Sequence, residues 1–250
     1  MKSGLLLALG ALVTLSVAAA AQTLQGPVPL PEPRSLQTAK IARVPYDKLM
    51  QVRALPEYHE PDWVAALVKA GKLPPVGQRL PAQPIVEPMS AATDGDGIYG
   101  GVLRHVSGGR PQGWNWNAGQ SQGTGTLDEL VEECLLSTGP MWQLTQDRID
   151  PLPNLATGWE WSEDGHQLTM HLLRGARWSD GVPFTAEDVM FYWEDNVSDP
   201  NVPARTQPGA FGAGTKLERL DDFTIRWTFP EVRPVANLYK MAYSGLCPGP

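Results

Sequence analysis

The stretch LRGARWSDGVPFTAEDVMFYW, residues 173–193, decides how the fold of this chain is read. Trp178 is expected to end a strand, and the Asp180-Gly181 pair predicts a turn directly after it. Thr185, followed three residues later by Asp188, predicts a capping box that opens a helix. Each part of the stretch then has a structural task, so we interpret it as framework and not as a reaction site. The expected buried side of the helix is Ala186, Val189, Met190 and Trp193.

Two β-hairpins are predicted on either side of this framework. In GWEWSEDGHQLTMHLL, residues 158–173, apolar and polar side chains alternate after an Asp164-Gly165 turn. In KLERLDDFTIRWTF, residues 216–229, the turn is Asp221-Asp222 and an aromatic-rich apolar face follows. Another helix is predicted from Pro234 to about Tyr243.

A strand, a loop and a helix are predicted before the first hairpin. GGVLRHVSGG, residues 100–109, alternates like a strand, and TLDELVEECLLSTG, residues 126–139, carries a capping box and an apolar stripe. This order indicates an α/β fold. The intervening loop, residues 107–125, combines Gly, Ser, Asn, Gln, one Arg and two Trp. Such a composition suits a ligand-contacting loop, and the alternative is a flexible surface loop.

The first 98 residues predict an exported chain with a long extension. Lys2 precedes an uncharged, Leu- and Ala-rich run that ends in Ala19-Ala20-Ala21, so residues 1–21 are interpreted as a signal peptide rather than as a membrane anchor. No cysteine stands near that cleavage point. Residues 22–98 are proline-rich, and only EPDWVAALVKAGKLPP, residues 60–75, has a helical pattern. The remainder is expected to be polyproline-like chain.

Composition argues against several functions. With 20 Lys and Arg against 27 Asp and Glu, the net charge of −7 does not attract nucleic acid or anionic lipid. The four histidines lack metal-ligand spacing, so neither a metal nor another cofactor is expected. Glu160, Glu163 and Asp164 are better explained as turn residues than as the acid/base pair of a glycosidase. Cys134 and Cys247 can form a disulfide or remain two buried thiols, and the sequence leaves this open.

A longer ordered pattern carries a family likeness. PLPNLATGWEWSEDGHQLTMHLLRGARWSDGVPFTAEDVMFYWE, residues 151–194, resembles the signature region of the family 5 extracellular solute-binding proteins of ABC importers, the peptide- and nickel-binding group. The flanking segments are similar to that family's first strand, next helix and later hairpin. The matching positions are Leu155, Ala156, Trp159, Glu160, Ser162, Asp164, Gly165, Arg174, Gly175, Trp178, Asp180, Gly181, Pro183 to Ala186, Asp188 and Val189.

The resemblance implies an α/β fold of the type II periplasmic-binding class, with a mixed sheet, β-hairpins and helices in its first lobe. Family members are about twice this length, so residues 99–250 are interpreted as a partial first lobe and the chain as truncated. The implied function is binding without catalysis: a monomer captures a peptide in the periplasm or outside the cell and delivers it to a membrane permease. Ser107, Gly108, Trp114 and Asn115 are the ligand-binding residues expected in this part of the chain.

Three alternatives remain open from the sequence. An oligosaccharide carrier is one, because Trp114, Trp116 and Trp142 can stack on sugar rings. A secreted glycoside hydrolase is the second, and it needs two carboxylates facing each other across a groove. A structural or interaction module is the third.

Overall fold

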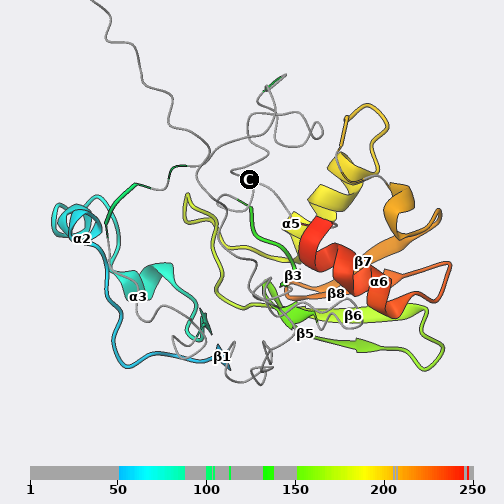
Figure 1. The fold of residues 1–250 in the computed structure, drawn as a ribbon, viewed down its shortest axis with the longest axis horizontal. Helices are drawn as coiled ribbons and strands as arrows, with labels where there is room; N and C mark the ends of the chain where they lie inside the picture. The colour runs from blue at the N-terminus through cyan, green and yellow to red at the C-terminus, as the bar shows by residue number, and fades with distance from the viewer. Residues whose placement is uncertain are drawn as a thin grey trace, which may run out of the picture. The chain divides into compact units, whose positions relative to one another are not determined.

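The computed structural model describes residues 51–87, 100–102, 104, 113, 132–137, 151–204, 206, 208–244 and 247, all of which belong to one compact unit, residues 41–250. Most of the regular structure lies after residue 150 (Figure 1). The strands are β1 Gln51–Val52, β2 Ile85–Val86, β3 Leu136–Ser137, β4 Leu152–Pro153, β5 Ala156–Trp161, β6 Gln167–Leu172, β7 Lys216–Asp221 and β8 Thr224–Thr228. The α-helices are α2 Asp62–Lys69, α3 Val76–Arg79, α5 Ala186–Phe191 and α6 Pro234–Tyr239, with π-helical turns at Tyr192–Val197 and Lys240–Ser244 and a 3-10 turn at Pro208–Phe211.

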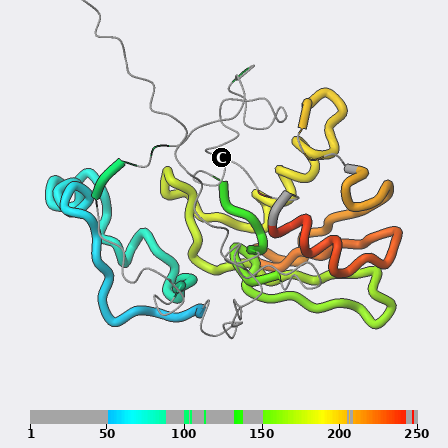
Figure 2. The backbone as a smooth tube through the Cα atoms, in the orientation of Figure 1, coloured from blue at the N-terminus to red at the C-terminus, as the bar shows by residue number. Residues whose placement is uncertain are grey.

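A four-stranded antiparallel sheet, in the order β5-β6-β8-β7, forms the centre of the body. Both predicted hairpins are confirmed: β5 pairs with β6 and β7 pairs with β8, as the tube in Figure 2 shows. The two hairpins join through β6 and β8, where Met170 faces Ile225 and Leu168 faces Trp227. Every strand pair among the described residues is antiparallel.

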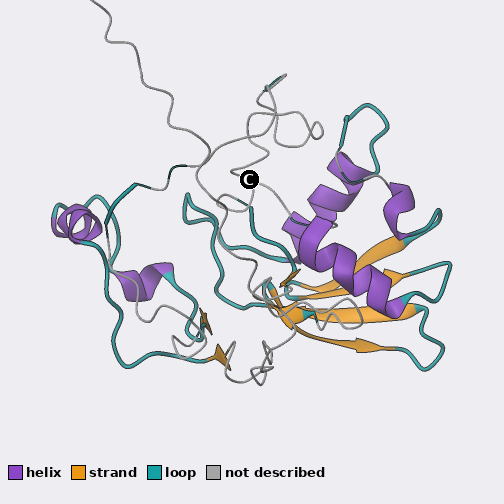
Figure 3. Ribbon diagram, in the orientation of Figure 1, coloured by secondary structure: helices purple, strands orange, loops and turns teal. Residues whose placement is uncertain are grey.

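One face of this sheet is apolar, and α5 and α6 cover it (Figure 3). The alternation that predicted the hairpins places Leu168, Met170 and Leu172 in the core, while His171 stays exposed. The predicted helices supply the opposite side of the core. Ala186 and Val189 of α5 are fully buried, and Leu238 and Met241 follow from the segment that begins at Pro234.

An aromatic cluster fills the centre of this core. Trp227, which has no exposed surface, stacks on Phe229 and Phe211 with ring centroids 6.2 and 5.6 Å away. Trp193 meets Trp227 edge to face at 5.0 Å. Stacked and edge-to-face ring pairs of this kind stabilise a core beyond the area that they bury. Several of the nine tryptophans therefore serve packing.

The framework interpretation of residues 173–193 is supported by one carboxylate. Asp188 accepts hydrogen bonds from the backbone N–H of Thr185 at 2.7 Å and from the indole Nε1 of Trp178 at 2.9 Å. The side chain of Thr185 caps α5 in return. Gly181, with φ of 91°, makes the predicted turn. In place of the regular strand that was expected to end at Trp178, the structure has a single β-bridge between Arg177 and Pro183.

Removing this carboxylate should loosen the junction between turn and helix. We expect Asp188→Ala to lower the free energy of unfolding by about 1–3 kcal/mol, because it removes a helix cap and leaves the indole N–H of Trp178 without its acceptor. Urea unfolding followed by tryptophan fluorescence measures the change. Asp195→Ala, which removes an exposed carboxylate on the following turn, is the matched control. An equal loss in both variants would contradict this role of Asp188.

The predicted helix over residues 126–139 is wrong in its second half. Residues 132–134 have no helical structure, and Leu136–Ser137 forms β3, which pairs with β4. The backbone N–H of Ala156 also donates to the carbonyl of Leu135 at 2.8 Å. Pairing with a distant strand, together with complete burial of Leu135 and Leu136, outweighs the local helical periodicity. Residues 126–131 lie outside the described part of the chain.

The predicted strand at residues 100–109 is not found in the positions that are described. Gly100 and Gly101 have φ of 134° and 77°, outside the extended region that a strand requires, and Val102 is 75% exposed. A pair of glycines can bend the chain where alternation alone predicts an extended backbone. The remaining positions of this segment, apart from Arg104, lie outside the described residues.

The proline-rich extension contains the predicted helix and two elements that were not expected. α2 follows Pro61 and is followed by Gly71 with φ of 69°, as its sequence indicates. α3 and the short β1–β2 pair replace part of the expected polyproline-like chain. Among the helices that the structure describes, none has the length and apolarity needed to cross a membrane.

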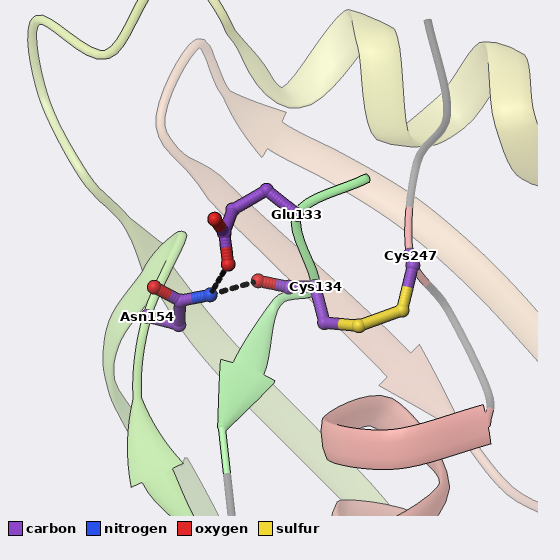
Figure 4. Close-up of a disulfide and its surroundings, with 4 residues drawn as sticks. All are labelled: Glu133, Cys134, Asn154 and Cys247. Carbon is purple, nitrogen blue, oxygen red and sulfur yellow. Dashed lines mark hydrogen bonds between the residues drawn. A yellow bond between two sulfur atoms is a disulfide. The ribbon is translucent and has the colours of Figure 1, made fainter. Parts of the chain in front are cut away.

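A disulfide joins Cys134 to Cys247 across 113 sequence positions and settles the pairing that the sequence left open. Figure 4 shows it beside Asn154, whose side-chain amide is directed at Glu133 and at the backbone carbonyl of Cys134. The Asn154 amide donates to that carbonyl at 2.9 Å and to the Glu133 carboxylate. The chain before β3 is therefore tied covalently to the segment after α6.

Candidate functional site

The four residues predicted to contact ligand, Ser107, Gly108, Trp114 and Asn115, lie outside the described residues. Of their loop, only Gly113 is described, and it is partly exposed. These four positions therefore stay predictions.

Described residues line a shallow hollow and a larger groove. The shallow hollow, of about 320 Å³, lies against Trp159 and Gly158 of β5, with Pro151 and Pro153. The larger groove, of about 1000 Å³, lies between residues 72–82 and the turn at residues 175–181. Small-molecule sites in proteins occupy about 300–1000 Å³, so the groove has the volume of a ligand site.

The groove joins two segments that are about a hundred positions apart in the sequence. Residues 72–82, which include α3, form one wall of the groove. In this wall Arg79 forms an ion pair with Glu60, and its Nε donates to the carbonyl of Pro74 at 2.9 Å. The backbone of Gly175, with φ of 85°, forms part of the opposite wall. A Cβ atom at Gly175 would lie 3.4 Å from Cα of Pro81, so the two walls approach closely at this point.

Sequence reasoning missed this groove because its walls come from different regions. The framework stretch supplies Arg177, Trp178 and Asp180, and the extension supplies Lys72 and Arg79. Each side chain has an ordinary local explanation: a turn, a helix end or a linker. Gly175 gave no separate signal either, because it lies in a turn with φ of 85°, and the turn alone explains a glycine there.

The acidic residues of the hairpin turns have local structural partners. Asp164 accepts from the hydroxyl of Ser162 at 2.6 Å and from the backbone N–H of His166 at 3.0 Å, and these bonds, the first being the stronger, lower the pKa of its carboxyl. The backbone N–H of Phe223 likewise lowers the pKa of Asp221. A general acid in glycoside hydrolysis needs a raised pKa, so these two carboxyls suit turns better than catalysis.

Glu160 and His171, two other polar residues weighed from the sequence, lie close to each other on the sheet. Glu160 lies on the exposed face of the sheet, 3.3 Å from Nε2 of His171. Within the described ranges, no three His, Cys, Asp or Glu side chains are grouped closely enough to hold a metal ion.

One known protein family has a model that matches the part of the chain that contains the four-stranded sheet. Residues 150–248 match the model described as "Bacterial extracellular solute-binding proteins, family 5 Middle". This range contains both hairpins, α5 and α6. It also contains the whole of residues 151–194, the segment that resembles this family in sequence.

Individual relatives agree with that match. The chain is 54% identical over 214 residues to a periplasmic alpha-galactoside-binding protein of Rhizobium meliloti (strain 1021), covering 84% of this chain and 31% of the relative. It is 43% identical over 107 residues to the periplasmic oligopeptide-binding protein OppA of Escherichia coli (strain K12), covering 36% of this chain and 19% of the relative.

Solved structures show the same fold. The periplasmic binding protein MelB of Agrobacterium fabrum C58, in complex with stachyose, superimposes with a TM-score of 0.76 and 53% identity, over 88% of this chain and 34% of MelB. An oligopeptide-binding protein OppA matches with a TM-score of 0.53 and 30% identity, over 76% of this chain and 26% of that protein.

The α/β, periplasmic-binding-protein fold predicted from the sequence is thereby confirmed. The chain spans about a third of the length of the alpha-galactoside-binding protein and of MelB. The signature residues, the fold around the four-stranded sheet and the matches to solute-binding proteins agree, and together they support a family 5 bacterial extracellular solute-binding protein, of which this chain spans a part.

Proposed function

We propose that this chain is part of the solute-binding component of an ABC importer, which captures a small solute outside the cytoplasmic membrane and delivers it to a membrane permease. Family membership carries this proposal. Proteins of this class work by closing two lobes around the ligand and presenting the closed form, so no bond is made or broken. The chain then contributes binding contacts and a rigid scaffold, as a monomer and without catalysis.

The ligand class that we propose first is an oligosaccharide containing α-galactoside units. The observation that favours it is 54% identity over 84% of this chain to a protein named for binding alpha-galactosides. The similar MelB structure is a complex with stachyose. The family resemblance placed peptides first, and peptides are now the second candidate because the OppA relatives match shorter parts of this chain at 43 and 35% identity.

The ligand contacts that we propose in this part of the chain are Ser107, Gly108, Trp114 and Asn115. A tryptophan offers a flat apolar face on which a sugar ring can stack, and Ser and Asn supply hydrogen bonds to hydroxyl groups. The proposed division of the chain is a signal peptide at residues 1–21, an extension at 22–98 and part of the first lobe from residue 99 onward.

Export is supported by an observation that is independent of the relatives. The Cys134–Cys247 disulfide is stable in the oxidising conditions outside the cytoplasm and is uncommon in reducing compartments. This agrees with the proposed removal of residues 1–21 during secretion and with the periplasmic relatives.

Thermal melting of the 250-residue chain with stachyose, and separately with mixed di- to oligopeptides, tests the ligand class. We expect stachyose to raise the melting temperature, because a ligand at about a hundred times its Kd adds about 2.7 kcal/mol to the stability of the form that binds it. Trp114→Ala should remove most of that rise, whereas Trp63→Ala, a matched change at an exposed position of α2, should not.

Each outcome decides between the candidates. A rise with peptides but not with stachyose would make the protein a peptide carrier. No rise with either class would contradict the proposal that this part of the chain carries ligand contacts.

A further inference from the structure

The groove between residues 72–82 and 175–181 has a lining with an excess of hydrogen-bond donors. Three of its side chains, Lys72, Arg79 and Arg177, can only donate. Among the described residues that line the groove, the one carboxylate is that of Asp180, and its Oδ1 already accepts from the backbone N–H of Val182 at 2.9 Å. A ligand that satisfies such a lining must bring acceptors.

Two of the three cations are available for such a ligand. Arg79 is neutralised by Glu60, whereas Lys72 and Arg177 have no carboxylate partner among the described residues. Arg177 is nevertheless held in place, because its Nη1 donates to the carbonyl of Gly181 at 2.8 Å. That bond uses one of five guanidinium N–H groups and leaves the others free to bind a planar oxyanion.

The charge of the groove also contrasts with that of the whole protein. The chain has a net charge of −7, yet the described residues of this lining include three cations and one carboxylate. A neutral sugar exchanges both donors and acceptors with its site and is therefore a poorer match to a lining that mainly donates. The volume of about 1000 Å³ exceeds what a lone inorganic ion needs, and it admits a solute that bears the oxyanion.

We propose that this groove binds a small solute through a carboxylate or phosphate group, with Arg177 and Lys72 as the anion contacts on its two walls. The site uses residues of the extension and of the framework turn together. None of the described residues that line the groove is one of the four proposed transport contacts.

Titration calorimetry of the 250-residue chain with inorganic phosphate and with citrate, at constant ionic strength, tests this site. Arg177→Gln should weaken binding about tenfold or more, because a charge-assisted hydrogen bond is lost, and Lys72→Gln should weaken it by a smaller factor. Arg53→Gln is the matched control: it removes the same charge at an exposed position outside the groove and should bind as the parent chain does.

The two probes distinguish the chemical source of the anion. Binding of citrate alone, lost in Arg177→Gln, assigns the site to carboxylated solutes, and binding of phosphate alone assigns it to phosphorylated ones. The proposal is overturned if neither anion binds, or if both bind equally well to the parent, Arg177→Gln and Arg53→Gln chains. Circular dichroism of each variant establishes that it is folded, and Lys72→Gln provides the second test if Arg177→Gln is not.

Discussion

Replacing Trp227 with alanine is expected to lower the free energy of unfolding by about 3–5 kcal/mol, the range measured for large aromatic side chains removed from cores. The ring is fully buried between Phe211, Phe229 and Trp193, so its loss leaves a cavity that three aromatic neighbours cannot fill without moving. Because such a cost is a large share of the stability of an ordinary domain, the variant is expected to be partly unfolded at moderate temperature. Urea denaturation followed by circular dichroism measures the change.

Two further variants separate cavity formation from loss of the indole. The Nε1 atom of Trp227 is buried without a hydrogen-bond partner among the described residues, so Trp227→Phe sacrifices no hydrogen bond and should cost less than Trp227→Ala. Trp63→Ala, at a side chain that is mostly exposed, should change the stability by less than about 0.5 kcal/mol. Comparable losses for the two alanine variants would refute the central role of Trp227.

Removing the disulfide is the second change with a large expected effect. The double variant Cys134→Ser, Cys247→Ser should lose about 2–5 kcal/mol of stability, because the cross-link across 113 positions restricts the unfolded chain. Reduction of the parent chain with dithiothreitol should lower its melting temperature in the same direction. Thiol titration after denaturation measures the bond directly: no free thiol is expected before reduction and two are expected after it.

The double serine variant is also the control for the reductant. Its melting temperature should not respond to dithiothreitol, so any residual effect reports on the reagent alone. A parent chain that melts identically in its oxidised and reduced states would show that the bond contributes nothing to stability.

The parts of the fold that the sequence predicts correctly are governed by local physics. An Asp-Gly turn between alternating residues specifies the first hairpin, and Thr185 with Asp188 specifies the start of α5 within four residues. The same reasoning fails at residues 132–137, where partners fifteen or more positions away decide the structure. Local periodicity contains no information about such partners.

The disulfide pairing and the groove could not be predicted from the sequence, for a related reason. Two cysteines 113 positions apart are equally compatible with a bridge and with two buried thiols until the fold brings them together. The groove depends on the contact between the extension and the turn near Gly175, which neither segment predicts alone. The four ligand-contact residues remain predictions, because their loop lies outside the described part of the chain.

The bond between Cys134 and Cys247 also changes the consequence of peptide-bond cleavage. Both hairpins and the two helices that cover the sheet lie between these cysteines, so they belong to one covalent ring. A protease that cuts once inside this ring opens it but releases no fragment, and the two new ends stay tethered within one molecule. In a compartment that contains proteases, the nicked chain therefore keeps its parts together until the bond is reduced.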